Sequence, residues 1–125
     1  MKFFTWFFNL FKSNKLIMQL AIQSLAGEFF NRNPKFNVPV QNVITQVLTN
    51  INSFSTSIAS LPTTLKQLVA KQTQLTAPEQ ALVSVFIDQL SVPIMAYLDK
   101  TNLSLSAQTA QIVEILGWIM DISKV

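Results

Sequence analysis

The sequence contains no cysteine and no histidine, and only two of its 125 residues are glycine. Without cysteine there is no disulfide framework, no zinc–thiolate site and no thiol nucleophile. Without histidine the chain lacks the commonest metal ligand and the commonest general base near neutral pH. Two glycines cannot supply the tight turns of a β-sandwich or barrel, or a glycine-rich phosphate loop. We therefore expect an all-α, non-enzymatic chain with no metal, no cofactor and no small-molecule substrate.

Charge is also scarce. Only 12% of the residues are charged and 50% are hydrophobic, whereas a soluble domain has about 25% charged residues. No charged residue lies between Lys35 and Lys66, where Ser, Thr, Asn and Gln supply the polar positions. This composition excludes intrinsic disorder and favours a chain that associates with copies of itself or with other protein subunits.

The net charge of +3 is concentrated near the N-terminus. Five cations precede residue 36 against one acid, Glu28; they are Lys2, Lys12, Lys15, Arg32 and Lys35. They are spread among phenylalanines and do not form the compact basic patch of a nucleic-acid-binding protein. We therefore expect no nucleic-acid partner.

Prolines and capping residues divide the chain into helices. The first helical segment should stop at residues 31–34, and Pro62 indicates a later break. Thr76 and Glu79 have the spacing of a capping box, with Pro78 in the first turn of the helix that follows. Ser104 or Ser106 should cap the last helix. The pattern predicts a bundle of four to five helices, divided into an amphipathic N-terminal segment (1–33) and a bundle (34–125).

In two of the predicted helices the spacing of apolar residues indicates which side is buried. The fourth, which runs to about residue 99 with a kink at Pro93, should bury Leu82, Val85, Phe86, Leu90, Ile94 and Leu98. The fifth should bury Ile112, Ile115, Leu116, Ile119 and Ile122. Asp88 interrupts the fourth helix and is interpreted as a paired or interface residue. Glu114 and Asp121, seven residues apart, share a face that we interpret as solvated rather than as a paired-carboxylate site.

The first fifteen residues form an aromatic amphipathic pattern. Its candidate attachment residues are Phe3, Phe4, Trp6, Phe7, Phe8, Phe11, Lys12 and Lys15. Aromatic side chains beside a cationic stripe suit a helix that lies in a membrane interface. The same side chains could instead pack on the chain's own bundle or on a neighbouring subunit, which is the more usual fate of an apolar stripe.

The charge-free stretch contains a heptad pattern. Apolar residues step by four and three through Val40, Ile44, Val47, Ile51, Phe54, Ile58 and Leu61. We interpret this seam as one helix that meets copies of itself. The many β-branched residues leave a strand as the alternative, although strict alternation is missing.

Membrane and export signals are incomplete. The most apolar run, residues 81–98, contains Asp88 and Gln89, and a central Asp costs about 2.5–3.5 kcal/mol on insertion. We expect no spanning helix, unless an oligomer shields those two groups. Residues 16–26 resemble the apolar core of a signal peptide, but Gln19 and Gln23 interrupt it and the aromatic stretch before it is a poor n-region. We therefore expect no cleaved secretory signal.

Together these features predict a non-enzymatic structural or assembly protein that works within an oligomer or larger particle, for example as a component of a phage or virus. The alternative is a membrane-docking or membrane-active protein that inserts its Phe-rich N-terminal helix. The expected location is accordingly a virion or a membrane-associated assembly.

Overall fold

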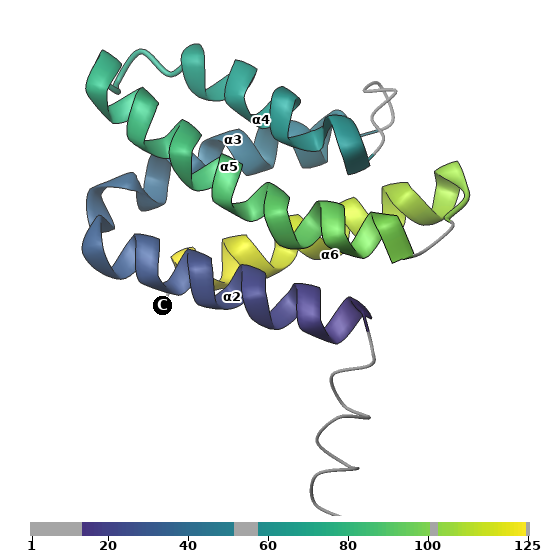
Figure 1. Cartoon of the computed structure of the whole chain (residues 1–125). Coiled ribbons are helices and arrows are strands. Elements are labelled where there is room, and N and C mark those ends of the chain that lie inside the picture. The colour runs from purple at the N-terminus through teal and green to yellow at the C-terminus, as the bar shows by residue number, and fades with distance from the viewer. Residues whose placement is uncertain (1–13, 52–57, 101–102, 125) are drawn as a thin grey trace, which may run out of the picture.

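The computed structural model describes residues 14–51, 58–100 and 103–124, and within these ranges it contains helices and no strand. The helices are α2 (Asn14–Arg32), α3 (Asn37–Thr49), α4 (Leu61–Ala70), α5 (Ala77–Lys100) and α6 (Leu105–Ser123), with short 3₁₀ helices at Pro34–Phe36 and Ile58–Ser60. In Figure 1, α5 runs between α4 and α2, and α3 and α6 lie behind it. The predicted all-α bundle is confirmed.

The helix ends follow the local signals in the sequence. α2 ends at Arg32, inside the predicted stop. At the start of α5 the backbone N–H of Thr76 donates to Glu79 Oε1 at 2.9 Å, and the N–H of Glu79 donates to Thr76 Oγ1 at 3.3 Å. Ser104 caps α6 by accepting a hydrogen bond from the N–H of Ala107 at 3.2 Å. These reciprocal and single caps satisfy amides that the first turn of a helix leaves unpaired.

The predicted single helix from Val40 to Leu61 is wrong. α3 ends at Thr49, where the N–H of Asn50 turns back to the carbonyls of Gln46 and Val47, and α4 begins at Leu61. Pro62 lies in the first turn of α4, where a missing N–H costs nothing. Because α3 and α4 are separate helices that pack against each other, both can bury their apolar sides in one chain.

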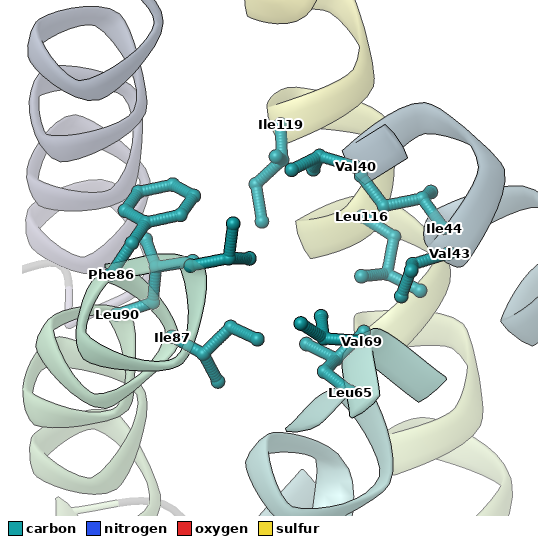
Figure 2. Close-up of a pocket in the computed structure, with 11 residues that line it drawn as sticks. Val40, Val43, Ile44, Leu65, Val69, Phe86, Ile87, Leu90, Leu116 and Ile119 are labelled. Atoms are coloured by element: carbon teal, nitrogen blue, oxygen red, sulfur yellow. The ribbon is translucent and has the colours of Figure 1, made fainter. Parts of the chain in front are cut away.

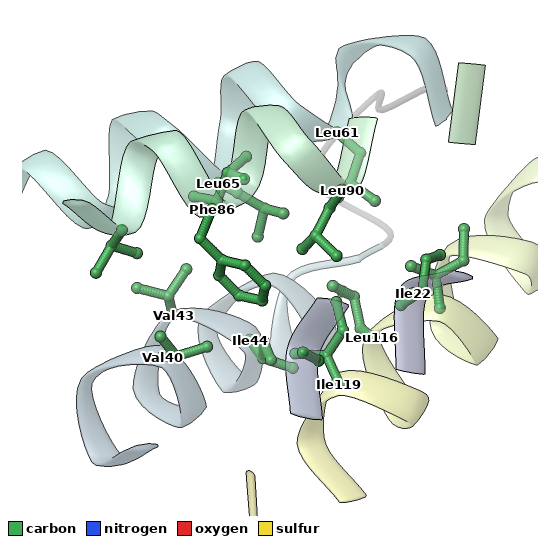
Figure 3. Packing of buried hydrophobic residues seen from close by; sticks show 14 of the residues in the cluster. Ile22, Val40, Val43, Ile44, Leu61, Leu65, Phe86, Leu90, Leu116 and Ile119 are labelled. Carbon is green, nitrogen blue, oxygen red and sulfur yellow. The ribbon is translucent and has the colours of Figure 1, made fainter. Parts of the chain in front are cut away.

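One hydrophobic core joins all five helices. Figure 3 shows Ile22, Ile44, Leu65, Leu90 and Leu116 converging from different helices. α2 packs against both α5 and α6, so the core extends across the expected division at residue 33. Residues 14–32, the described part of the N-terminal segment, therefore form one helix of the bundle.

An aromatic cluster fixes α2 against α5. The ring of Phe29 lies 4.2 Å from that of Phe86 and 5.6 Å from that of Phe36, and Phe30 meets Phe86 edge-on at 5.8 Å. Aromatic rings bury large areas and gain about 0.5–1.5 kcal/mol per pair beyond burial. The cluster therefore determines how α2 lies along α5.

Polar contacts attach the end of α6 to α3. Asn37 Nδ2 donates to the carbonyl of Ser123 at 2.7 Å, and Gln41 Nε2 donates to Ser123 Oγ at 2.9 Å. The last carbonyls of a helix have no partner within it, and Ser123 is buried. The uncharged side-chain amides of α3 therefore bind the end of α6 as well as covering the surface.

Candidate interaction surface

The outward side of α5 is exposed and mostly apolar. We call it the α5 face; it comprises Ala81, Leu82, Val85, Asp88, Gln89, Val92, Met95 and Ala96. Val92 is 71% exposed and Val85 is 52% exposed. Single exposed aliphatic residues are normal on a protein surface, whereas a run of them along one helix indicates an interaction site.

The prediction of which side chains of α5 are buried is partly wrong. Phe86, Leu90 and Ile94 are buried as expected, but Leu82 and Val85 are exposed. Val83 and Ile87 are buried in their place. Apolar residues occur on nearly every side of α5, so periodicity does not determine which side faces inward. That choice depends on where α2 and α4 contact the helix.

Charges at the rim of the α5 face are paired within the chain. On the α4 side Lys66 Nζ lies 2.5 Å from Asp88 Oδ1. On the α2 side Arg32 is paired with Glu28 at 2.8 Å, and Lys35 is paired with Glu79 at 3.0 Å. The expectation that Asp88 is a paired residue is confirmed. Because each cation has an acid beside it, these pairs add no net charge to the rim.

Glu79 shows the electrostatic effect of this pairing. The pKa of its carboxyl lies below the ordinary value, first because the Thr76 amide donates a hydrogen bond to it and second because Lys35 donates another. Both interactions favour the charged carboxylate. Glu79 therefore serves as a cap and as an ion-pair partner at the start of α5.

A groove separates the α5 face from α2. Its walls include Leu25, Phe29 and Arg32 from α2, and Leu82, Val85 and Gln89 from α5. Gln89 therefore borders the α2 side of the face, whereas Asp88 borders the α4 side through its pair with Lys66. Phe86 also lines the groove, and Leu82 and Val85 belong to both the groove and the α5 face, so the two are continuous.

The bundle also contains a cavity, shown in Figure 2. Its volume is about 20 Å³, and its lining is entirely hydrophobic, with Phe86, Ile87 and Leu90 on one side and Val43, Leu65 and Leu116 on the other. A water molecule needs about 10–15 Å³ of such space and two to four polar partners. The cavity has no polar partners and is too small for a cofactor, so it is a packing defect.

The predicted attachment residues fall mainly outside the described part of the chain. This applies to Phe3, Phe4, Trp6, Phe7, Phe8, Phe11 and Lys12. Lys15 is described, and its ammonium lies 2.8 Å from the carboxylate of Glu114 on α6. Lys15 therefore joins α2 to α6.

The predicted self-association seam lies in the core of the single chain. Val40, Ile44, Val47, Ile58 and Leu61 are at most 7% exposed. Ile51 is half-buried, and Phe54 lies outside the described residues. The heptad pattern thus marks side chains that pack on α4, α5 and α6, and the buried members present almost no surface to a second copy.

The acidic residues whose side chains the structure describes do not converge on a chemical centre. Glu114 and Asp121 are both exposed on α6, and Glu114 is paired with Lys15. In the ranges that the structure describes, no group of three or more Asp, Glu, His or Cys residues could hold a metal ion.

The same ranges contain one helix long and apolar enough to cross a membrane, Ala77–Leu98, and a third of its most apolar window is buried inside the bundle.

The α5 face was not predicted from the sequence, although its residues follow a recognisable spacing. Ala81, Val85, Val92 and Ala96 follow one side of the helix, opposite the buried Val83 and Ile94. Comparison with known proteins adds no assignment: no protein-family model, no curated protein and no solved structure matches this chain.

Proposed function

We propose that this chain is a non-enzymatic structural or assembly protein that works within an oligomer or a larger particle, such as that of a phage or virus. The observation that carries the proposal is the α5 face, an apolar strip left exposed along a 24-residue helix. Removing apolar surface from water contributes about 25 cal/mol per Å². Association would therefore stabilise a strip that is unfavourable on a free monomer.

The charge distribution supports a protein partner for this strip. Lys66, Arg32 and Lys35 are neutralised by acids of the same chain. A surface that binds anionic lipid or nucleic acid needs unpaired cations to attract the phosphates. A neutral rim around an apolar strip is instead typical of a contact between protein subunits.

Sedimentation velocity of the full-length protein tests the proposal. The 14.0 kDa chain should sediment as a dimer or larger species, with a distribution that shifts toward the monomer on dilution. A chain that remains monomeric up to the highest soluble concentration would contradict the proposal, because the α5 face would then be stable in water.

A membrane-docking function is the second candidate. One observation favours it: the apolar segment Ala77–Leu98 is long enough to span a bilayer. The Phe-rich residues 1–13 are a second source of membrane affinity in the sequence.

Flotation with anionic and neutral vesicles distinguishes the two candidates. A membrane protein of this kind would float as the full chain. Loss of flotation when Phe3, Phe4, Phe7 and Phe8 are replaced by Ser would assign the insertion to the N-terminal segment, and retained flotation would assign it to Ala77–Leu98. An assembly protein would stay with the soluble fraction in both forms and would keep its oligomeric size.

A further inference from the structure

The α5 face is arranged symmetrically about the middle of its helix. α5 runs from Ala77 to Lys100, so its midpoint lies between Asp88 and Gln89. Val85 and Val92 are equally far from this point, as are Ala81 and Ala96, and Leu82 and Met95. Each apolar side chain of the α5 face before the midpoint therefore has an apolar counterpart of similar size after it, while Asp88 and Gln89 flank the midpoint itself.

We propose that the α5 face binds a second copy of this chain, with the two α5 helices antiparallel about a twofold axis between Asp88 and Gln89. This inference rests on the proposed function and names its partner. In a twofold contact, residue i meets residue j of the partner and j meets i. An antiparallel pair centred at the midpoint brings Val85 to Val92 of the other copy, and Ala81 to Ala96. The contact is hydrophobic along its centre and has small residues near both ends.

The polar residues of the face fit the same axis. Gln89 lies on the side of the α5 face that borders the groove beside α2. A twofold axis in the plane of the contact places this side of one copy next to the same side of the other copy. The two Gln89 carboxamides would then lie side by side. Each carboxamide has both a donor and an acceptor, so the pair can form reciprocal hydrogen bonds.

Asp88 lies on the other side of the axis, beside α4. A pair of carboxylates across a twofold axis would repel each other if they were unpaired. Lys66 Nζ already lies 2.5 Å from the Asp88 carboxylate in the single chain. Two such ion pairs side by side form a neutral group of four charges. Antiparallel α5 helices also place opposite ends of their dipoles together.

The absence of cysteine makes this contact directly testable. Disulfides form only when the two Cα atoms are about 4.4–6.8 Å apart, and residues seven positions apart on a helix are separated by about 10 Å along its axis. Val85→Cys alone and Val92→Cys alone should therefore cross-link poorly, whereas an equal mixture of the two should cross-link on mild oxidation. Ala110→Cys, exposed on α6, is the control that should not cross-link.

A charge on the face provides the second measurement. Val92→Glu should abolish the dimer in sedimentation velocity, because it would bury a carboxylate against Val85 of the partner. Val113→Glu on α6 is the matched control, since Val113 is also exposed, at 44%. Both variants should keep the helical circular dichroism of the parent chain, because neither side chain lies in the core.

The outcomes separate this contact from the more general proposal. Strong cross-linking of Val85→Cys alone would indicate parallel helices and overturn the antiparallel contact. An oligomer that survives Val92→Glu without any 85–92 cross-link would overturn the contact and leave the assembly function standing. A parent chain that is monomeric at every concentration would overturn both the α5 contact and the assembly function. A monomeric parent chain that floats with vesicles, and loses this flotation in the Val92→Glu variant, would also overturn both.

Discussion

The rings of Phe29 and Phe86 lie parallel, with centroids 4.2 Å apart and planes inclined by 3°. Phe29 belongs to α2 and Phe86 to α5, and both side chains are at most 9% exposed. Their contact joins two helices that are far apart in the sequence. It also fixes which side of α5 faces inward, and so determines that Val85 and Val92 face outward.

Replacing Phe86 should destabilise the bundle strongly. Phe86→Ala removes a ring that contacts both Phe29 and Phe30, and such truncations cost about 3–5 kcal/mol in the free energy of unfolding. Val85→Ala, at the adjacent exposed position, should change the folding of the monomer by less than about 0.5 kcal/mol. Urea denaturation at low protein concentration measures both, and equal losses would contradict the assigned orientation of α5.

The capping box should contribute measurably to stability. Thr76→Ala leaves the N–H of Glu79 without the threonine hydroxyl that accepts its hydrogen bond, and loss of an N-cap costs about 0.5–2 kcal/mol. Thr76→Ser keeps the hydroxyl and should retain most of the stability. Thermal unfolding followed by circular dichroism distinguishes the two substitutions, and identical melting curves for Ala and Ser would contradict the cap.

Acid should weaken the start of α5 through Glu79. The folded pKa of this carboxyl is below its ordinary value of 4.5, so the unfolded chain takes up its proton first as the pH falls. The stabilisation is therefore complete above pH 4.5 and is lost as the pH drops through the lower folded value. Glu79→Gln should reduce the slope of stability against pH in this window, and an unchanged slope would contradict the role of Glu79.

Filling the internal cavity should stabilise the protein. Val83 lines the cavity of about 20 Å³, and Val83→Ile adds one methylene, which contributes up to about 0.8 kcal/mol when it is buried without strain. Val113→Ile on the exposed side of α6 is the control and should have little effect. Denaturant midpoints measure both; a clear loss for Val83→Ile would indicate that its surroundings have no room to accept the group.

The ion pair between Lys15 and Glu114 should contribute little. Its side chains are 48% and 43% exposed, and exposed pairs contribute about 0–1 kcal/mol. Lys15→Ala, Glu114→Ala and the double variant form a cycle that isolates the coupling. Its coupling energy should fall further in high salt, whereas a salt-independent value above this range would contradict the exposed geometry.

Local chemistry was enough to predict several elements. Asn33 and Pro34 ended α2, the Thr76–Glu79 box opened α5, and Ser104, one of the two serines expected there, capped α6, because each signal acts within one turn of backbone. The heptad at Val40, Ile44 and Val47 correctly marked apolar positions, but its partner was misassigned. A pattern of apolar residues requires burial and does not distinguish the chain's own helices from those of another copy.

The sequence by itself determined the all-α class, the end of α2 and the starts of α5 and α6, since these follow from composition and short-range hydrogen bonds; it did not determine the end of α3 at Thr49. The tertiary structure alone decided which apolar side chains stayed in water. α5 is hydrophobic on most of its circumference, and the stacking of Phe29 on Phe86 chose one side for the core. The side of α5 that points away from the buried Val83 and Ile94 became the exposed α5 face, because neither α2 nor α4 covers it.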